Sequence, residues 1–219
     1  MHLDCVKIAF VNHSDTLPIP DAPRASYHHG DLRAALVAAA EGLLAEGMPL
    51  SLRSVAKAAG VSHAAPYHHF ANLEALMAAV AARGFADLAA AMESAHRPGD
   101  TAATLVGHCT AYVDFALTRP AVFRLMFSPL LQRKSDHPAL LAAADGSFEV
   151  LRAAAQAHVP GGGDELALAG WSLAHGLAGL AIDGALSAAP VSTMPPVQAL
   201  AAMLASRLLA NFPAGGAAG

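Results

Sequence analysis

Apolar residues recur every three or four positions along most of the chain, which is the spacing of an amphipathic helix. Runs of β-branched residues are few and strong helix formers are abundant, so the pattern predicts an all-α protein. Glycine and proline residues separate the periodic stretches, as they do where helices end. The pattern predicts about nine helices, over residues 31–46, 52–59, 63–70, 72–96, 101–118, 121–127, 139–158, 164–186 and from 195 onward.

The two ends of the chain lack this periodicity. Residues 1–26 mix polar residues with three prolines, which predicts a flexible arm, and residues 214–219 are expected to form a disordered tail. A misplaced translation start would also explain the arm. The apolar patch at 6–11 is too short, and lacks the basic start, for a signal peptide.

Two short helices joined by a tight turn are predicted in the stretch SLRSVAKAAGVSHAAPYHHF, residues 51–70. Ser51 and Ser62 are suited to cap the two helices, and Gly60 is suited to the left-handed backbone that ends the first. Ala56 is small enough to let the helix axes cross closely. This arrangement is a helix-turn-helix, which places its second helix in the major groove of DNA, although a helical hairpin in any all-α protein has similar spacing.

Four segments around this motif, YHHGDL, SLRSVAKAAGVS, AAPYHHF and NLEAL, resemble the N-terminal domain of TetR-family transcriptional regulators. Far downstream, Trp171, His175 and Gly176 resemble the W-x-x-x-H-G signature of one TetR subgroup. The resemblance implies a DNA-binding domain at 27–72 and a regulatory and dimerisation domain at 73–213. It also implies a homodimeric repressor that binds a palindromic operator and is released by a small-molecule effector.

Several residues of the motif are expected to approach bases and phosphates. Histidine can donate to guanine, alanine methyl groups can meet a thymine methyl, and hydroxyl groups suit phosphates. The predicted DNA-binding residues are Ser51, Arg53, Ser62, His63, Ala64, Ala65, Tyr67 and His68. Pro66, Leu73 and His68 depart from residues common in the family, and the last two replace frequent cations.

The chain carries little positive charge with which this domain could attract DNA. The net charge is −4, and between residues 27 and 72 three cations balance three anions. Five histidines lie in the same window, and a reference pKa of about 6.5 predicts that DNA affinity rises as the pH falls from about 7.5 to about 6. Few fixed cations also predict a shallow dependence of affinity on salt.

The C-terminal part offers candidates for an effector cavity and a dimer interface. The residues expected to line the cavity are Cys109, Tyr112, Phe123, Met126, Phe127, Phe148, Trp171 and His175, which also suit an ordinary core. Residues 164–186 are apolar nearly all round, so this helix must be buried on two sides, one of them against a partner subunit. The residues expected at the dimer interface are Leu173, Leu177, Leu180, Leu200, Leu204 and Leu208. A chain this apolar favours a hydrophobic or aromatic effector.

The sequence gives little support for a metal-binding protein, an enzyme, a disulfide-rich protein or a membrane protein. The 12 histidines include no pair four apart on a predicted helix, so no metal is expected, and no cofactor or catalytic motif is found. Two cysteines without a disulfide pattern suit the cytoplasm, and the longest uncharged helical run, 17 residues, falls short of a membrane span. The competing interpretation is a helical ligand-binding or adaptor protein whose DNA-binding head is vestigial.

Overall fold

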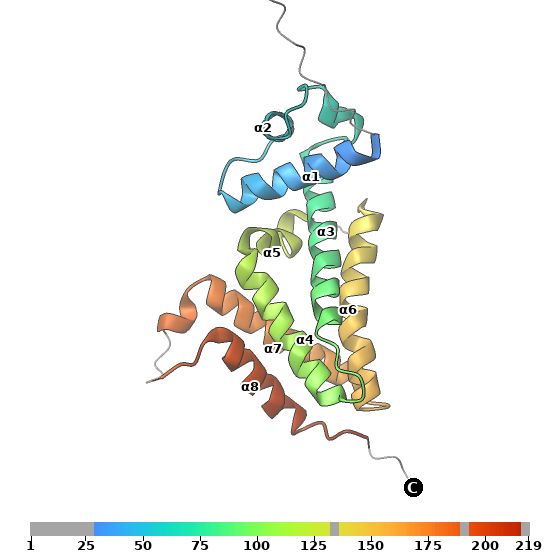
Figure 1. Ribbon diagram of the computed structural model, residues 1–219, viewed down its shortest axis with the longest axis vertical. Helices are drawn as coiled ribbons and strands as arrows, with labels where there is room; N and C mark the ends of the chain where they lie inside the picture. Colours follow the sequence, from blue (N-terminus) through green and yellow to red (C-terminus); the bar gives the residue numbers. More distant parts are fainter. Residues whose placement is uncertain (1–28, 132–135, 189–192, 216–219) are drawn as a thin grey trace, which may run out of the picture.

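The computed structural model describes residues 29–131, 136–188 and 193–215, and in these ranges the chain folds into eight α-helices. A small head lies at one end and contains α1 (His29–Ala45) and α2 (Leu52–Ala58), and an elongated body lies below it (Figure 1). The long helix α3 (Leu73–Ser94) begins at the head and continues down into the body. The all-α prediction is therefore confirmed.

Local capping explains where the helices of the head begin and end. The Ser51 hydroxyl accepts a hydrogen bond from the Ser54 N–H at 2.9 Å, and the Ser54 hydroxyl accepts one from the Ser51 N–H, which forms a capping box. Gly60 follows α2 with a φ of 70°, a conformation that glycine adopts without strain. Asn72 caps α3 by accepting from the Ala75 N–H at 2.8 Å. These three predicted boundaries are confirmed.

The second helix of the predicted helix-turn-helix is shorter than expected. Residues 63–70 contain only one short 3-10 helix, η1 (Ala65–His68), so the described residues hold eight α-helices where the sequence suggested about nine. Pro66 explains the difference, because it has no N–H to donate and its ring is buried in the head. The predicted cap at Ser62 is wrong, since η1 begins after Ala64 and has no side-chain cap.

The body is built from five further helices around α3. They are α4 (Thr101–Thr118), α5 (Pro120–Met126), α6 (Pro138–His158), α7 (Gly163–Ile182) and α8 (Val197–Leu209). Helix α3 packs along α6, and α4 packs against α7 and α8 (Figure 1). A continuous hydrophobic core extends from Leu36 in the head to Ala205 in α8, so head and body share one core.

The head touches the body through α3 and α5. Helix α1 packs on both of them. At the crossing of α3 and α5, a Cβ added to Gly84 would lie 2.8 Å from the Met126 sulfur and 2.9 Å from Val122 Cγ1. The glycine therefore permits a close approach of the two helices, which makes α5 a tightly held link between the body and α1.

The two terminal segments that the sequence predicts lie partly or wholly outside the residues that the structure describes. The arm at 1–26 lies outside the described residues, and so does 216–219 of the predicted disordered tail. Within the described residues, the Gly215 N–H donates to the His158 carbonyl at 3.0 Å, and the disordered tail stays a prediction. The His158 ring also bonds the Thr101 hydroxyl at 2.8 Å and the Phe212 carbonyl at 3.1 Å.

Helices α3 and α7 are each long and apolar enough to cross a membrane by length and composition. Within the described residues both belong to the helical body, where α3 is covered by α4, α5 and α6 and α7 by α4, α6 and α8. A core helix of a protein passes the same test as a membrane span, and each of these two helices packs against at least three others, so we interpret both as helices of the body.

Candidate nucleic-acid interface and effector cavity

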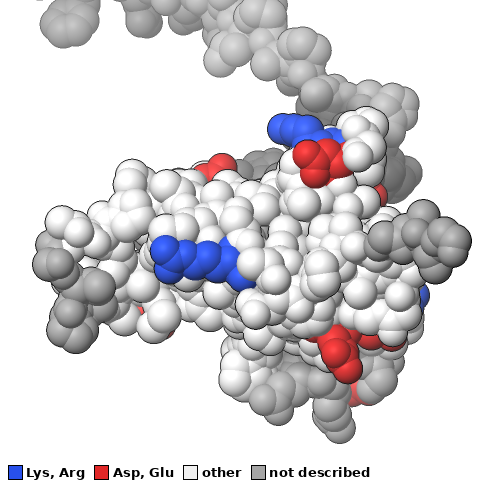
Figure 2. Space-filling model, turned by 90° about the horizontal axis from the view of Figure 1, so that it is seen from below, with Lys and Arg blue, Asp and Glu red and all other residues white. Residues whose placement is uncertain are grey.

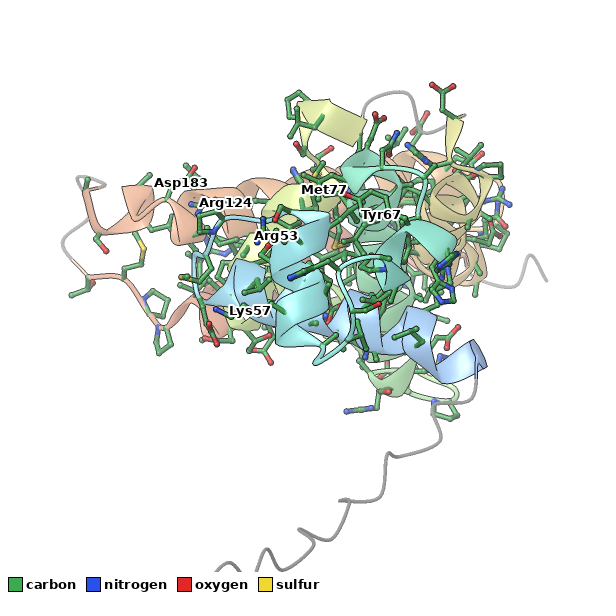
Figure 3. The ribbon with its side chains drawn as sticks, turned by 90° about the horizontal axis from the view of Figure 1, so that it is seen from above. Arg53, Lys57, Tyr67, Met77, Arg124 and Asp183 are labelled. Carbon is green, nitrogen blue, oxygen red and sulfur yellow. The ribbon has the colours of Figure 1, made fainter. Side chains whose placement is uncertain are left out.

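The outer end of the head presents the cations of α2. Arg53 and Lys57 lie four residues apart on this helix, both are exposed, and both project from α2 in the view from above (Figure 3). Sequence reasoning counted Lys57 among the cations but omitted it from the candidate site. The i,i+4 spacing was the available signal, because it places both side chains on one face of the helix.

The segment after α2 exposes most of the predicted DNA-binding residues. Tyr67 is 63% exposed, and Ser62, His63, Ala64 and His68 are also exposed, whereas Ala65 is half-buried. Phe70 is buried and takes the Arg33 guanidinium on its ring at 5.2 Å, so it packs the core of the head. His63 and Tyr67 therefore lie at the surface of the head, whereas Pro66 and Phe70 are buried in it.

A cavity of about 340 Å³ lies in the body between α3, α4, α6 and α7. Four of the predicted cavity residues line it, namely Tyr112, Phe127, Phe148 and Trp171. Its other apolar walls come from Phe85, Leu88, Met92, Leu151 and Leu168, and Ser147 and the exposed Asp145 lie among its lining residues. The size and apolar lining are those of a small-molecule site.

The other predicted cavity residues lie elsewhere. Phe123 and His175 line a separate opening of about 210 Å³ between α5 and α7, and Cys109 lines a narrow neighbouring cavity. Met126 is fully buried against Gly84 and lines none of these three cavities, so it belongs to the core. Apolar periodicity marks burial, and it does not distinguish core from cavity.

A chain of hydrogen bonds runs along one wall of the cavity. The Trp171 indole N–H donates to the Tyr112 hydroxyl at 3.3 Å, and that hydroxyl lies 2.9 Å from Nδ1 of His175. Burial raises the pKa of Tyr112, an effect that the hydrogen bond from Trp171 partly offsets, and burial lowers the pKa of His175. Both side chains are therefore uncharged near neutral pH, which suits a site for an uncharged ligand.

Aromatic contacts continue this chain to α5. The His175 ring lies 5.3 Å from the Phe123 ring and 4.4 Å from the Phe127 ring, measured between centroids. Phe123 also packs edge-on against Tyr112 at 5.7 Å. A change at the cavity wall therefore reaches α5 through direct contacts.

Arg119, directly before α5, joins this helix to the head. Its guanidinium lies 2.6 Å from Asp87 of α3 and 3.1 Å from Glu41 of α1, and it stacks on Phe115 at 5.3 Å. Arg83 approaches the same Glu41 at 3.7 Å. Glu41 is the member on the head, so these ion pairs connect the start of α5 to α1.

Comparison with known proteins decides the family. The model of "Bacterial regulatory proteins, tetR family" matches residues 35–80, and the model of "Tetracyclin repressor-like, C-terminal domain" matches residues 105–208. The chain belongs to the TetR family. It is a DNA-binding transcriptional regulator of that family and not an enzyme. The family match favours this assignment over the competing interpretation, a helical ligand-binding or adaptor protein with a vestigial DNA-binding head.

Several solved structures share the fold of this chain. A protein of unknown function from Rhodococcus sp. RHA1 is 32% identical, with a TM-score of 0.72, 87% of this chain covered and 100% of the other. A tetR-family regulatory protein from Rhodococcus RHA1 is 21% identical, with a TM-score of 0.59 and coverage of 84% and 98%. PfmR, a TetR-family regulator from Thermus thermophilus, is 21% identical, with a TM-score of 0.56 and coverage of 80% and 97%. A comparison with curated proteins finds no significant match.

The W-x-x-x-H-G subgroup stays a prediction, as do the domain boundaries at 27–72 and 73–213. The C-terminal family model does span Trp171, His175 and Gly176. In the part of the chain that the structure describes, no group of three His, Cys, Asp or Glu side chains is placed to hold a metal ion.

The predicted dimer residues differ in their exposure and fall into three sets. Leu177 is buried in the core of its own chain, whereas Leu180 is 50% exposed on α7. Leu173, Leu200, Leu204 and Leu208 are half-buried. Leu168 on α7 and Met203 on α8, which sequence reasoning missed, are 53% and 37% exposed. Seen from below, the end of the body is covered mostly by uncharged side chains (Figure 2).

Proposed function

We propose that this TetR-family protein is a homodimeric, cytoplasmic repressor that leaves a palindromic operator when a small, apolar effector fills the cavity in its body. The observation that carries this proposal is the continuous contact from the 340 Å³ cavity to the head, through Tyr112, α5 and Arg119. A cavity without that connection would suit a carrier better than a regulator.

DNA binding in this proposal uses the exposed face of the head. Ser51 and the backbone N–H groups at the start of α2 contact phosphates, with Arg53 and Lys57 supplying the charge. His63, Ala64 and Tyr67 reach base edges and the adjacent backbone, and Ser62, Ala65 and His68 flank them. Two heads of a dimer then occupy major grooves about 34–36 Å apart.

The dimer surface is proposed on α7 and α8. Leu168, Leu180 and Met203 are large apolar side chains that water reaches in the single chain. Leu168 and Leu180 lie on α7 and Met203 lies on α8, the two helices that the apolar pattern of the sequence assigns to the interface. Helix α7 also carries Trp171 and His175, so a partner packed on it would sense the state of the cavity wall.

Release is proposed to follow from unequal effector affinity for two conformations of the dimer. An effector that presses on Tyr112 and Phe127 shifts α5, and Arg119 transmits that shift to Glu41 and the head. The two heads then lose the spacing that the operator requires. Effector and operator therefore oppose each other by the same coupling free energy in both directions.

A ligand screen tests this proposal. Small apolar molecules are tested for a rise in the melting temperature of the full chain, and an effector at a hundred times its Kd should add about 2.7 kcal/mol, or roughly 5–10 °C. Each hit must also lower the affinity for the operator, and Trp171→Ala must weaken its effect. Hits that stabilise the protein but leave DNA affinity unchanged would contradict the proposal.

A further inference from the structure

One buried polar side chain has no role in the account above. His108 lies on α4, one helical turn before Tyr112, and is only 3% exposed. Neither of its ring nitrogens has a hydrogen-bond partner among the described residues. A buried polar group in this condition costs free energy, so its place needs an explanation.

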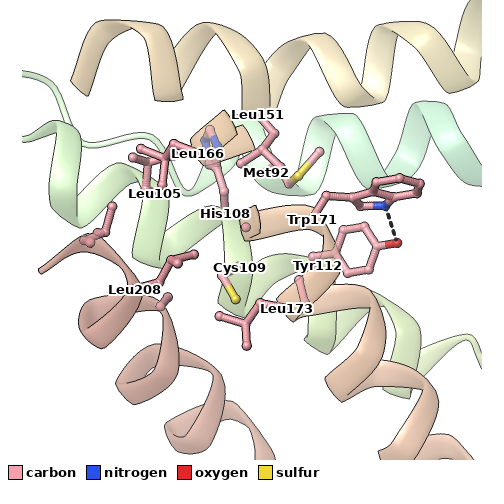
Figure 4. Close-up of a pocket in the computed structure, with 14 residues that line it drawn as sticks. Met92, Leu105, His108, Cys109, Tyr112, Leu151, Leu166, Trp171, Leu173 and Leu208 are labelled. Carbon is pink, nitrogen blue, oxygen red and sulfur yellow. Dashed lines mark hydrogen bonds between the residues drawn. The ribbon is translucent and has the colours of Figure 1, made fainter. Parts of the chain in front are cut away.

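His108 lines a narrow cavity next to the larger one. The narrow cavity has room of about 20 Å³, and Leu105, Leu151 and Leu166 lie around the imidazole (Figure 4). Four residues line both cavities and form the wall between them, namely Met92, Tyr112, Leu151 and Trp171. Met92 lies between His108 and Trp171 in the close-up, and an unbranched methionine re-orients readily to admit a ligand.

A single water molecule does not suit this position. A buried water needs two to four polar partners, and the other polar side chains of the narrow cavity already have partners. The Cys109 thiol is directed at the Ala201 carbonyl at 3.9 Å, and the Trp171 N–H at the Tyr112 hydroxyl. A water on His108 would therefore lack the other bonds it needs, whereas a ligand can bring the apolar remainder with it.

The chemistry of the walls selects the head group of that ligand. The residues that line the two cavities include no Lys or Arg, and the one acidic residue is Asp145 in the larger cavity, so a negatively charged head group has no cation to meet. Burial, with a contribution from His96, lowers the pKa of His108 to about 4, so the imidazole is neutral. A neutral imidazole has one donor and one acceptor, and a hydroxyl group can satisfy either.

We propose that His108 anchors the effector, and that the effector is an uncharged, mainly apolar molecule with a hydroxyl group, an alcohol or a phenol. The hydroxyl reaches His108 past Met92, and the apolar part fills the larger cavity beside Phe148 and Trp171. This inference rests on the proposed function, because it names the ligand class of the same site.

The test compares two probes that differ only in the hydroxyl group, para-hexylphenol and hexylbenzene. Trp171 is the one tryptophan of the chain and lines both cavities, so its fluorescence reports binding, with calorimetry as a second readout. The wild-type protein should bind the phenol about tenfold more tightly. His108→Leu should reduce this preference to less than about twofold, and His108→Gln, which keeps a donor and an acceptor, should retain part of it.

Three results would overturn the inference. They are equal binding of the two probes to the wild type, an undiminished preference in His108→Leu, and no binding of either probe. The melting temperature of unliganded His108→Leu should rise, because an unpaired imidazole is replaced by an apolar group; a fall would assign His108 a structural role instead. Failure of the proposed function is distinct, since the phenol would then bind with the expected preference and leave operator affinity unchanged.

Discussion

The ion pairs of Arg119 make the connection between body and head open to a direct test. The perturbation is Arg119→Leu, which removes the guanidinium but keeps an apolar stem over Phe115. Glu41→Gln serves as the matched change on the head, because it removes the charge of the partner and keeps its shape. If the ion pair between Arg119 and Glu41 holds α5 to α1, the effects of the two substitutions on the free energy of unfolding must be non-additive.

The structure sets the expected size of the effect. The side chains of Arg119 and Glu41 are 28% and 15% exposed, which places the pair between an exposed pair, worth up to about 1 kcal/mol, and a buried one, whose disruption costs about 3–5 kcal/mol. Arg83, 3.7 Å from Glu41, remains as a second cation. We therefore expect Arg119→Leu to cost about 2 kcal/mol, or roughly 4–8 °C in Tm.

The assay is urea unfolding followed by circular dichroism on the wild type, both single variants and the double variant. A coupling free energy of about 1 kcal/mol between the two sites is expected. Arg119→Leu should also bring the ratio of operator affinities, measured without and with an effector, closer to one. Strict additivity of the two substitutions, together with an unchanged ratio, would refute the reasoning.

Three further predictions follow from the body. Burial holds the pKa of His108 at about 4 in the folded protein, against 6.5 in the unfolded chain, so the unfolded chain takes up the proton first and stability falls as the pH drops from about 6.5 to about 4. The free energy of unfolding, measured against pH, should fall by up to about 3 kcal/mol less in His108→Leu than in the wild type. Equal pH profiles for the two proteins would contradict this prediction. Tyr112→Phe should cost about 2 kcal/mol in urea unfolding, because the Trp171 N–H loses its acceptor and His175 its partner; no loss of stability would show that this chain of hydrogen bonds does not matter. Leu180→Glu should shift the protein from dimer to monomer in analytical ultracentrifugation, with Leu141→Glu on α6, 40% exposed, as the control; a dimer that survives would move the interface elsewhere.

Much of the fold could be predicted from the sequence because the residues that begin and end the helices act locally. The caps at Ser51 and Asn72 and the left-handed Gly60 each act within a few residues, so sequence pattern alone places α2 and the start of α3. The same local reasoning overestimated the helix at 63–70. Proline near the start of a helix normally forfeits little, but in this short segment Pro66 leaves only a 3-10 helix.

The site was less predictable because its partners are far apart in sequence. The hydrogen bond between Trp171 and Tyr112 joins residues 59 apart, and the ion pair of Arg119 reaches back to Glu41 in the head. Met126 shows the limit of apolar periodicity, since a cavity wall and a core position look alike until Gly84 is seen packed on its sulfur. His108 follows the same limit, because no sequence signal shows that a buried imidazole lacks a partner.

The most direct test of the central claim is in-vitro selection from random duplex DNA, followed by sequencing of the bound pool. We expect an inverted repeat whose half-sites lie one helical turn apart, bound by the wild type and lost on His63→Ala combined with Tyr67→Ala. His69→Ala, at a half-buried position of the same segment, serves as the matched control and should retain the repeat. Absence of an enriched repeat at pH 6.5 and low salt, or a repeat bound equally well by the double variant, would contradict the account.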